Sequence, residues 1–221
     1  IHPHAEEAVC RSRMNTPNQP ESPASSSPAA TDRADRDARG YRPDAAGRGA
    51  RLRADVIDVT IARPTRSPAS AEVGDRFEVL QLQRTRDPLK GTWQPVMGHI
   101  DGQESATAAA MREAREEVGL NIADPAACAA FWALEQVHPY FISAIDCVVL
   151  SPRFLALVAP DWTPSLNHEH AAHRWVLLRD ASRSSTWPGQ RASLAEVATL
   201  LAGDSIEGPW LRIDPAKITI A

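Results

Sequence analysis

The sequence predicts a layered α/β domain built around a mixed β-sheet and preceded by a disordered N-terminal tail. Residues 1–53 contain no Phe or Trp and are rich in Pro, Ser, Ala and Arg, so they have too little apolar surface to offset the entropy of ordering them. Residues 54–221 contain several stretches that alternate apolar and polar residues and two stretches of helical character. Strands interspersed with helices indicate a sheet covered by helices, in a domain large enough for one substantial core.

The first expected elements are strands. Residues 54–64 alternate apolar and polar side chains and end at a proline, and residues 76–84 alternate again, which is typical of strands. Residues 65–75 between them are expected to form a loop, and residues 85–91 a turn. Residues 92–98 are expected to be short, extended and interrupted by a proline.

Two helices and four further strands are expected downstream. The first helix begins at Glu104 or Ser105, is rich in helix formers and is followed by Gly119 at the C′ position. The second helix covers residues 189–203, where apolar residues recur at helical spacing. The expected strands between the helices are residues 130–141, 142–150, 153–160 and 173–181.

Composition excludes several classes of protein. The net charge of −4 and the pI near 6.0 give no electrostatic reason to bind nucleic acid polymers or anionic membranes. Three cysteines without C-x-x-C spacing argue against a disulfide framework or a structural zinc site and fit a reducing cytoplasm. No apolar run approaches the roughly 18 to 20 residues that cross a bilayer. We therefore expect a cytoplasmic protein that binds neither nucleic acid polymers nor membranes.

Two kinds of functional motif are absent from the sequence or incomplete in it. The sequence has no glycine-rich phosphate-binding loop of the G-x-x-x-x-G-K-[ST] or G-x-G-x-x-G type. The run "HEHAAH" at residues 168–173 resembles the zinc-protease motif H-E-x-x-H, but Ala172 stands where the second histidine should be. Its three histidines could still bind a metal, although a polar loop at a sheet edge is favoured.

The end of the first helix gathers acidic residues where the helix dipole is already negative. Glu113, Glu116 and Glu117 share one face at spacings i, i+3 and i+4. Acidic groups at a helix C-terminus each cost about 0.3–1 kcal/mol, and Arg112 and Arg115 offset only part of that. A bound divalent cation would offset more, and clustered carboxylates suit Mg²⁺ or Mn²⁺.

The spacing of these residues resembles a known motif. In "GHIDGQESATAAAMREAREEVGL", Gly98 is followed after five residues by Glu104 and, after seven more, by "REAREEVGL". This arrangement matches the Nudix box, G-x5-E-x7-R-E-U-x-E-E-x-G-U, in which U is apolar. The chain therefore resembles the Nudix hydrolases, which implies an α/β/α sandwich around a mixed sheet.

The resemblance also implies roles for the residues of the box. Glu116 and Glu117 would be metal ligands together with the backbone carbonyl of Gly98. Glu113 would be a ligand or the general base for the attacking water, and Arg112 would hold the carboxylates in position. The structural residues of the box would be Glu104, which anchors the loop, and Gly119.

The implied chemistry is physically reasonable. Hydrolysis of a phosphoanhydride requires screening of the phosphate charge, orientation of a water molecule and a lowered pKa of that water. Carboxylates only accept hydrogen bonds and cannot bind phosphate without a metal. Mg²⁺ or Mn²⁺ dependence follows from this set of side chains.

The sequence around the box resembles the branch that hydrolyses dATP-type nucleotides and dihydroneopterin triphosphate, with W-Q before the box and E-H followed by R-W-V after it. Glu169 is a candidate further carboxylate ligand or base, or a surface residue. Arg84, Arg86 and Lys90 could contact phosphates or be free surface charges. Trp93 could stack on a ring system or pack in the core, and Gln94 could bond to a ring edge.

The predicted function is hydrolysis of a nucleoside triphosphate or dihydroneopterin triphosphate to the monophosphate and pyrophosphate. Alternative substrates are ADP-ribose, a dinucleotide polyphosphate or another nucleoside diphosphate derivative. A prenyl diphosphate isomerase is disfavoured because its upstream cysteine is missing, and a non-enzymatic nucleotide-binding module is disfavoured because all box carboxylates are present. The physiological substrate, the number of metal ions, the identity of the base and the oligomeric state stay open.

Overall fold

The protein is represented by a computed structural model, which describes residues 49–87, 89–203 and 205–219. The predicted disorder of the tail falls almost entirely on residues 1–48, which lie outside the described residues. The remainder, Ala50–Ala221, forms a compact unit of its own. The elements of this unit are described below by themselves.

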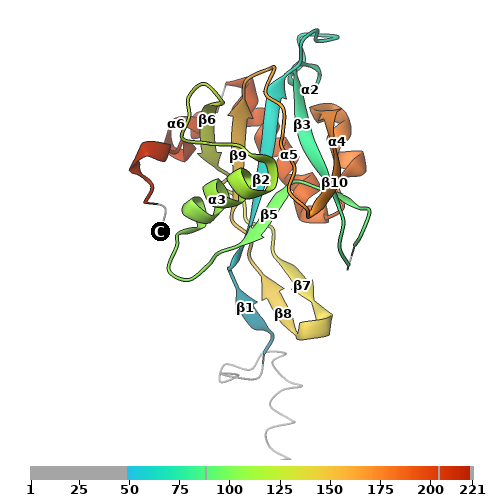
Figure 1. Cartoon of the computed structure of the whole chain (residues 1–221), viewed down its shortest axis with the longest axis vertical. Helices are drawn as coiled ribbons and strands as arrows, with labels where there is room; N and C mark the ends of the chain where they lie inside the picture. The colour runs from blue at the N-terminus through green and yellow to red at the C-terminus, as the bar shows by residue number, and fades with distance from the viewer. Residues whose placement is uncertain (1–48, 88, 204, 220–221) are drawn as a thin grey trace, which may run out of the picture. The chain divides into compact units, whose positions relative to one another are not determined.

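The described chain alternates strands and helices (Figure 1). The strands are β1 (Arg51–Arg53), β2 (Val56–Pro64), β3 (Phe77–Arg84), β4 (Trp93–Gln94), β5 (Val96–His99), β6 (Cys128–Ala133), β7 (Tyr140–Ile142), β8 (Cys147–Val149), β9 (Arg153–Val158) and β10 (His170–Leu177). The α-helices are α2 (Val73–Arg76), α3 (Ala106–Val118), α4 (Leu178–Ser184), α5 (Pro188–Ala202) and α6 (Gly208–Leu211), with 3-10 turns η1 (Ser143–Ile145) and η2 (Pro215–Lys217).

The central sheet is mixed, as the sequence predicts. Its strand order is β10-β3-β2-β9-β6, with β4 added to β3 and β5 added to β2. Strand β2 pairs in parallel with β9 and antiparallel with β3 and β5. A second, small sheet has the order β1-β8-β7. The parallel pairing of β2 with β9 brings together residues nearly a hundred positions apart in the sequence.

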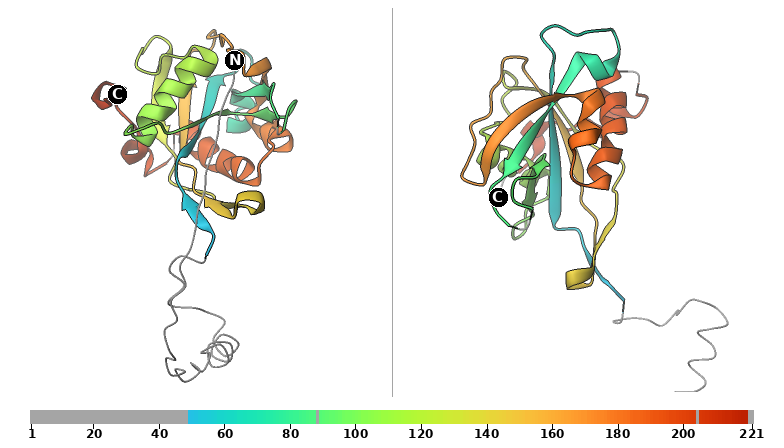
Figure 2. Two further views of the ribbon diagram at one scale, coloured as in Figure 1. Left: turned by 60° about the horizontal axis from the view of Figure 1, so that its bottom comes forward. Right: turned by 90° about the vertical axis from the view of Figure 1, so that its right-hand side faces the viewer.

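Helices cover both faces of the central sheet, with α3 on one side and α4 and α5 on the other (Figure 2). Alternation along β3 explains why the sheet is apolar on both faces: Leu80 and Leu82 join the core beneath α3, whereas Phe77 and Val79 join the core beneath α4 and α5. Helix α3 contributes buried alanines, whose small side chains let the helix lie close to the sheet. The predicted α/β/α layering is therefore confirmed.

Two expected elements differ in extent from the structure. The strand expected at 173–181 begins earlier, at His170, and ends at Leu177, because the chain turns into α4 and buries Leu178 and Ala181. The loop expected at 65–75 ends in the short helix α2. Asp75 of α2 is buried and pairs with Arg179 of α4, and a contact so distant in sequence gives no local signal.

The strands expected at 130–141 and 142–150 are divided. Strand β6 ends at Ala133, and the chain resumes strand structure only at β7. The 3-10 turn η1 and Asp146, whose φ of 47° lies in the left-handed region, then separate β7 from β8. Apolar runs of this length predict strands but do not reveal a hairpin turn within them.

The last residues of the segment predicted to be disordered form a strand. Residues 51–53 form β1, which pairs in parallel with β8. The N–H of Leu150 donates to the carbonyl of Arg53 at 2.8 Å, and Leu52 is exposed. Backbone pairing with β8 creates this strand without an apolar pattern, so the sequence could not predict it.

None of the described helices is both long enough and apolar enough to cross a membrane.

Candidate active site

A cleft of about 610 Å³ opens beside α3, at the ends of β5 and β10. Its walls come from β2, the end of β3 and the turn after it, the segment around β5, helix α3, the loop before β10 and the residue before α5. The acidic and basic residues that line it are Arg84, Asp101, Arg112, Glu113, Glu116 and Glu169. The fold thus brings box residues and Glu169 to one cleft.

Both ends of α3 are capped. The Ser105 hydroxyl accepts a hydrogen bond from the N–H of Ala108 at 3.1 Å, as an N-cap residue does. Gly119 adopts a φ of 73°, which favours glycine, and its N–H donates to the carbonyl of Arg115 at 3.0 Å. These caps fix the start and the end of the helix that carries the carboxylates.

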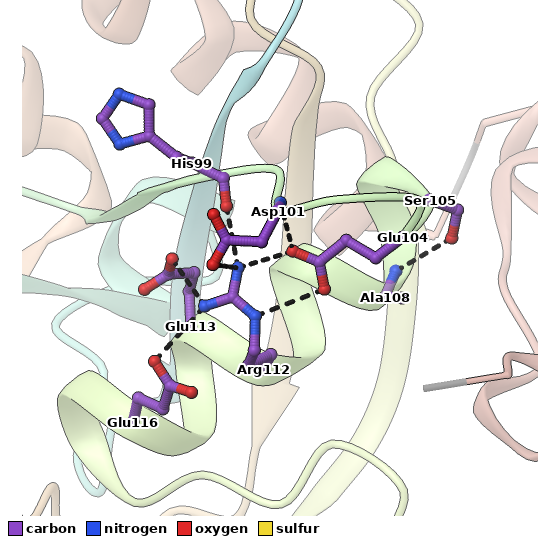
Figure 3. Close-up of polar contacts among 8 residues, drawn as sticks. All are labelled: His99, Asp101, Glu104, Ser105, Ala108, Arg112, Glu113 and Glu116. Carbon is purple, nitrogen blue, oxygen red and sulfur yellow. Dashed lines mark hydrogen bonds and ion pairs between the residues drawn. The ribbon is translucent and has the colours of Figure 1, made fainter. Parts of the chain in front are cut away.

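Arg112 is bonded to several carboxylates at once (Figure 3). Its guanidinium donates to both oxygens of Glu104 at 2.6 and 3.2 Å. It also donates to Glu113 at 2.9 Å, to Glu116 at 3.3 Å and to the carbonyl of His99 at 2.8 Å. Arg112 holds the pKa of Glu104 below its usual range, and Glu104 in turn raises the pKa of Arg112. One partly buried arginine therefore offsets much of the repulsion among the acids.

Glu113 packs directly against the backbone of Gly98. A Cβ atom at position 98 would overlap the carboxyl group of Glu113, so only glycine leaves room for it. Burial raises the pKa of Glu113, with smaller contributions from the charges of Glu116 and Glu169, while Arg112 opposes the rise. Glu113 is thus a carboxylate with a raised proton affinity on the wall of the cleft.

Glu117 lies behind the cleft wall, with a side chain that is only 2% exposed. Oε2 of Glu117 lies 2.9 Å from Nε2 of His170, which is equally buried. Burial raises the pKa of Glu117, His170 opposes the rise, and the charges of Glu113 and Glu169 add to it. Sequence reasoning missed His170 as a partner of Glu117, because 53 positions separate the two and nothing in "HEHAAH" marks its middle histidine.

The loop before β10 is fastened to the C-terminal end of α3. The N–H groups of Ser165 and Asn167 donate to the carbonyls of Val118 and Glu117, at 2.9 and 3.1 Å. The Asn167 side chain accepts a hydrogen bond from the N–H of Glu169 at 2.9 Å. This loop carries Glu169 to the cleft, where Nη1 of Arg86 lies 3.3 Å from its carboxylate.

The structure places two of the predicted substrate contacts in the cleft and two outside it. Arg84 and the buried Gln94 line the cleft, but Lys90 and Trp93 are not among its lining residues. The Trp93 ring lies under the guanidinium of Arg174, which is 4.0 Å from the ring centroid, and Lys90 is exposed in the turn before β4. Trp187, which sequence reasoning did not single out, lines the cleft.

The box residues fit a hard divalent cation by their chemistry. In the described part of the chain, no three His, Cys, Asp or Glu side chains are gathered as a ready-made metal site, because Arg112 and His170 engage the carboxylates. Nevertheless, Glu113 and Glu116 supply oxygen donors to the cleft and Gly98 keeps its backbone within reach of Glu113. Burial raises the pKa of Glu113, and the charges of Glu116 and Glu169 add to the rise; a bound cation would offset that repulsion.

Comparisons with known proteins agree with this geometry. A family model described as "NUDIX domain" matches residues 69–197. The chain is similar to an Ap4A hydrolase from C. elegans, with 23% identity, a TM-score of 0.54, and coverage of 68% of this chain and 99% of that one. It is also similar to a NUDIX hydrolase from Listeria monocytogenes, with 22% identity, a TM-score of 0.53, and coverage of 69% of this chain and 97% of that one. A third similar structure is the dihydroneopterin triphosphate pyrophosphohydrolase of E. coli, with 20% identity, a TM-score of 0.50, and coverage of 64% of this chain and 94% of that one. At these identities the solved structures share the fold, and they do not distinguish one branch from another.

Proposed function

Because the chain belongs to the Nudix hydrolase family, whose model matches residues 69–197, we propose that it cleaves a nucleoside triphosphate or dihydroneopterin triphosphate to the monophosphate and pyrophosphate. The observation that carries this proposal is the attachment of Glu104, Glu113 and Glu116 to the single guanidinium of Arg112 at the wall of the cleft. That arrangement supports phosphoanhydride hydrolysis because it concentrates oxygen donors where a polyphosphate would lie.

We propose that Glu113, Glu116, Glu117 and the backbone carbonyl of Gly98 hold Mg²⁺ or Mn²⁺. When bound, the cation would screen phosphate charge and lower the pKa of a water molecule. Glu117 must release His170 or share its carboxylate with it, because the two side chains are paired in the structure. Glu113 and Glu116 line the cleft, and both accept hydrogen bonds from Arg112 in the structure.

We assign proton transfer to one of two carboxylates that line the cleft, Glu113 or Glu169. The raised pKa of Glu113 suits a general base that takes a proton from the attacking water. Glu169 is the alternative base, since it lines the same cleft from the opposite loop. Arg112 positions Glu113 and does not need to touch substrate.

Substrate contacts are proposed at the remaining cleft residues. Arg84 contributes positive charge to the cleft and is the proposed phosphate contact, and Gln94 is a proposed polar contact to the rest of the substrate. Lys90 and Trp93 have less support, because neither lines the cleft. The proposed site of action is the cytoplasm, in keeping with Cys128 and Cys147, which are buried and free.

The test is hydrolysis of dATP, GTP, dihydroneopterin triphosphate, ADP-ribose and a dinucleotide polyphosphate by the full chain, measured as pyrophosphate release from the triphosphates and as nucleotide products separated by chromatography from the other two. We expect turnover of at least one triphosphate with Mg²⁺ or Mn²⁺ and none with EDTA. Turnover of ADP-ribose or the dinucleotide alone would replace the proposed substrate class with the alternative one. Absence of turnover with every substrate in the presence of either metal would refute the proposal.

The matched variants are Glu113→Gln and Glu135→Gln. Both remove one carboxylate, but Glu135 is an exposed residue that does not line the cleft. We expect the first to lower kcat at least about 100-fold, as loss of a general base or ligand does, and the second to leave kcat unchanged. Equal activity of the two variants would remove Glu113 from the proposed machinery.

A further inference from the structure

A second cavity, of about 390 Å³, adjoins the cleft and shares Met97 and Trp187 with it. It lies where the first turn of α5 approaches β2 and β9. Among its lining residues are three buried polar side chains, Asp58 from β2, Arg153 from β9 and Gln190 from α5, each no more than 5% exposed. These residues have no part in the proposed hydrolysis.

Each of the three side chains has a buried atom without a hydrogen-bond partner among the described residues. The atoms are Oδ1 of Asp58, Oε1 of Gln190 and Nη1 of Arg153. The first two are acceptors and the third is a donor. Buried polar atoms are almost always paired in native proteins, so three unpaired atoms in one cavity point to a ligand that pairs them.

Asp58 is the shared neighbour of the other two residues. Nε of Arg153 donates to its Oδ2 at 2.9 Å, and the two residues are paired across the parallel strands β2 and β9. Burial raises the pKa of Asp58, and Arg153 and the side-chain amide of Gln190 oppose the rise, so Gln190 lies beside the same carboxyl group. The cavity wall therefore offers a hydrogen-bond donor from Arg153, an acceptor from Asp58 and a second acceptor from Gln190, in that order.

An aromatic wall accompanies this polar edge. The rings of Tyr140 and Trp187 are stacked, with centroids 6.0 Å apart and planes at 22°, and both residues line the cavity. Flat apolar surface beside a few fixed polar groups is the usual make-up of a site for a planar ring system. Since Trp187 also borders the cleft, one substrate molecule could place its ring in this cavity and its polyphosphate in the cleft.

We infer that the cavity binds the heterocycle of the substrate and selects the 2-amino-4-oxopyrimidine edge that guanine and pterins share. That edge presents a carbonyl oxygen, a ring N–H and an amino group, which are complementary in order to Arg153, Asp58 and Gln190. Adenine has no carbonyl on this edge, and its ring nitrogen is an acceptor that would face the Asp58 carboxylate. The assignment rests on the proposed function, which places the polyphosphate in the neighbouring cleft.

Binding of phosphate-free compounds tests the inference without hydrolysis. The full chain is titrated with guanosine, neopterin and adenosine in calorimetric experiments without metal. Guanosine or neopterin is expected to bind at least about tenfold more tightly than adenosine, because a site built to hydrogen-bond a ligand rejects an analogue that leaves its buried groups unpaired. Tighter binding of neopterin identifies a pterin substrate, and tighter binding of guanosine identifies a guanine nucleotide. Equal affinity for adenosine, or no binding of any of the three, overturns the inference.

Gln190→Leu is the variant of choice, because it removes one acceptor at similar volume and leaves the pair of Asp58 with Arg153 in place. We expect the preference over adenosine to fall at least about fivefold, with adenosine affinity unchanged. Asp58→Asn is less suitable, since it leaves a buried arginine without its carboxylate and can unfold the protein. An unchanged preference in folded Gln190→Leu contradicts the assignment.

Trp187→Ala and Trp210→Ala form a matched pair for the aromatic wall. Trp210 is 91% exposed and lines neither cavity, so its removal should leave binding unchanged. Loss of Trp187 should weaken binding of guanosine and neopterin at least about fivefold, as loss of a stacking ring does. Equal effects of the two substitutions would place the ring elsewhere.

The inference and the proposed function can fail separately. A protein that hydrolyses triphosphates but binds the three compounds equally overturns the inference alone. A protein that binds guanosine or neopterin selectively but releases no pyrophosphate overturns the proposed function and keeps the cavity as a heterocycle site.

Discussion

Nε2 of His170 lies 2.9 Å from Oε2 of Glu117, and both side chains are almost completely buried. The contact connects the first residue of β10 to the last turn of α3 and gives the most deeply buried box carboxylate a partner within the protein. A carboxylate at this depth without a partner would be strongly destabilised. The pair therefore keeps Glu117 in place when no cation is bound.

The first prediction concerns this pair. His170→Phe keeps an aromatic ring but leaves the Glu117 carboxylate unpaired, so the free energy of unfolding should fall by about 1–3 kcal/mol. In a domain of this size, that corresponds to a lower Tm by roughly 2–4 °C per kcal/mol. The measurement is thermal unfolding in metal-free buffer, with His173→Phe, at an exposed position of the same strand, as the control.

The double variant completes the test. Glu117→Leu combined with His170→Phe removes both polar partners, and it should be more stable than His170→Phe alone because no unpaired carboxylate remains. Additive effects of the two substitutions would show that the buried contact has no energetic role.

The second prediction follows from the close approach of Glu113 to Gly98. Gly98→Ala introduces a methyl group into the space of the Glu113 carboxyl group, which must move. Displacement of a catalytic group by about 1 Å can cost about 100-fold in rate, so kcat should fall by about that factor while far-ultraviolet circular dichroism stays unchanged. Gly49→Ala is the control, since a Cβ there has no neighbour within 4 Å. Full activity of Gly98→Ala would mean that Glu113 does not need its observed position.

The third prediction concerns pH. Arg112 lowers the pKa of Glu104 below its ordinary value of 4.5. A carboxyl with a lowered pKa in the folded state stabilises the protein above its ordinary pKa, and that stabilisation is lost as the pH falls through the lowered value. The difference in unfolding free energy between wild type and Glu104→Gln should therefore be constant near neutral pH and shrink below about pH 4.5. Chemical denaturation between pH 3 and 7 in EDTA measures it, and a difference that grows on acidification would contradict the pairing.

The sequence revealed the reaction class because the box is local. Glu104, Arg112 and Glu113 lie within ten residues on one helix and its leading loop, so their spacing alone brings them together. The contacts of Glu117 with His170 and of Asp58 with Arg153 join residues 53 and 95 positions apart. Such contacts depend on which strands pair, and strand pairing is not encoded in any local pattern.

The elements of the fold follow the same division. Alternation of apolar and polar residues predicted β2 and β3, because the residues of each strand show the pattern of its own burial. Strand β1 and helix α2 depend instead on distant partners, β8 in one case and Arg179 in the other. Lys90 and Trp93 lie close to the box in the sequence, but Lys90 is in the turn before β4 and the Trp93 ring packs under the guanidinium of Arg174, so neither lines the cleft.

The central claim is that the box carboxylates of α3 bind the cation on which hydrolysis depends. The most direct measurement is the dissociation constant of Mn²⁺, followed by electron paramagnetic resonance, for wild type and for Glu113→Gln, Glu116→Gln and Glu117→Gln, with Glu135→Gln as control. We expect Mn²⁺ to bind wild type and the control equally and each box variant at least about tenfold more weakly, since each loses a charged oxygen ligand. Unchanged Mn²⁺ affinity in all three box variants would contradict the claim.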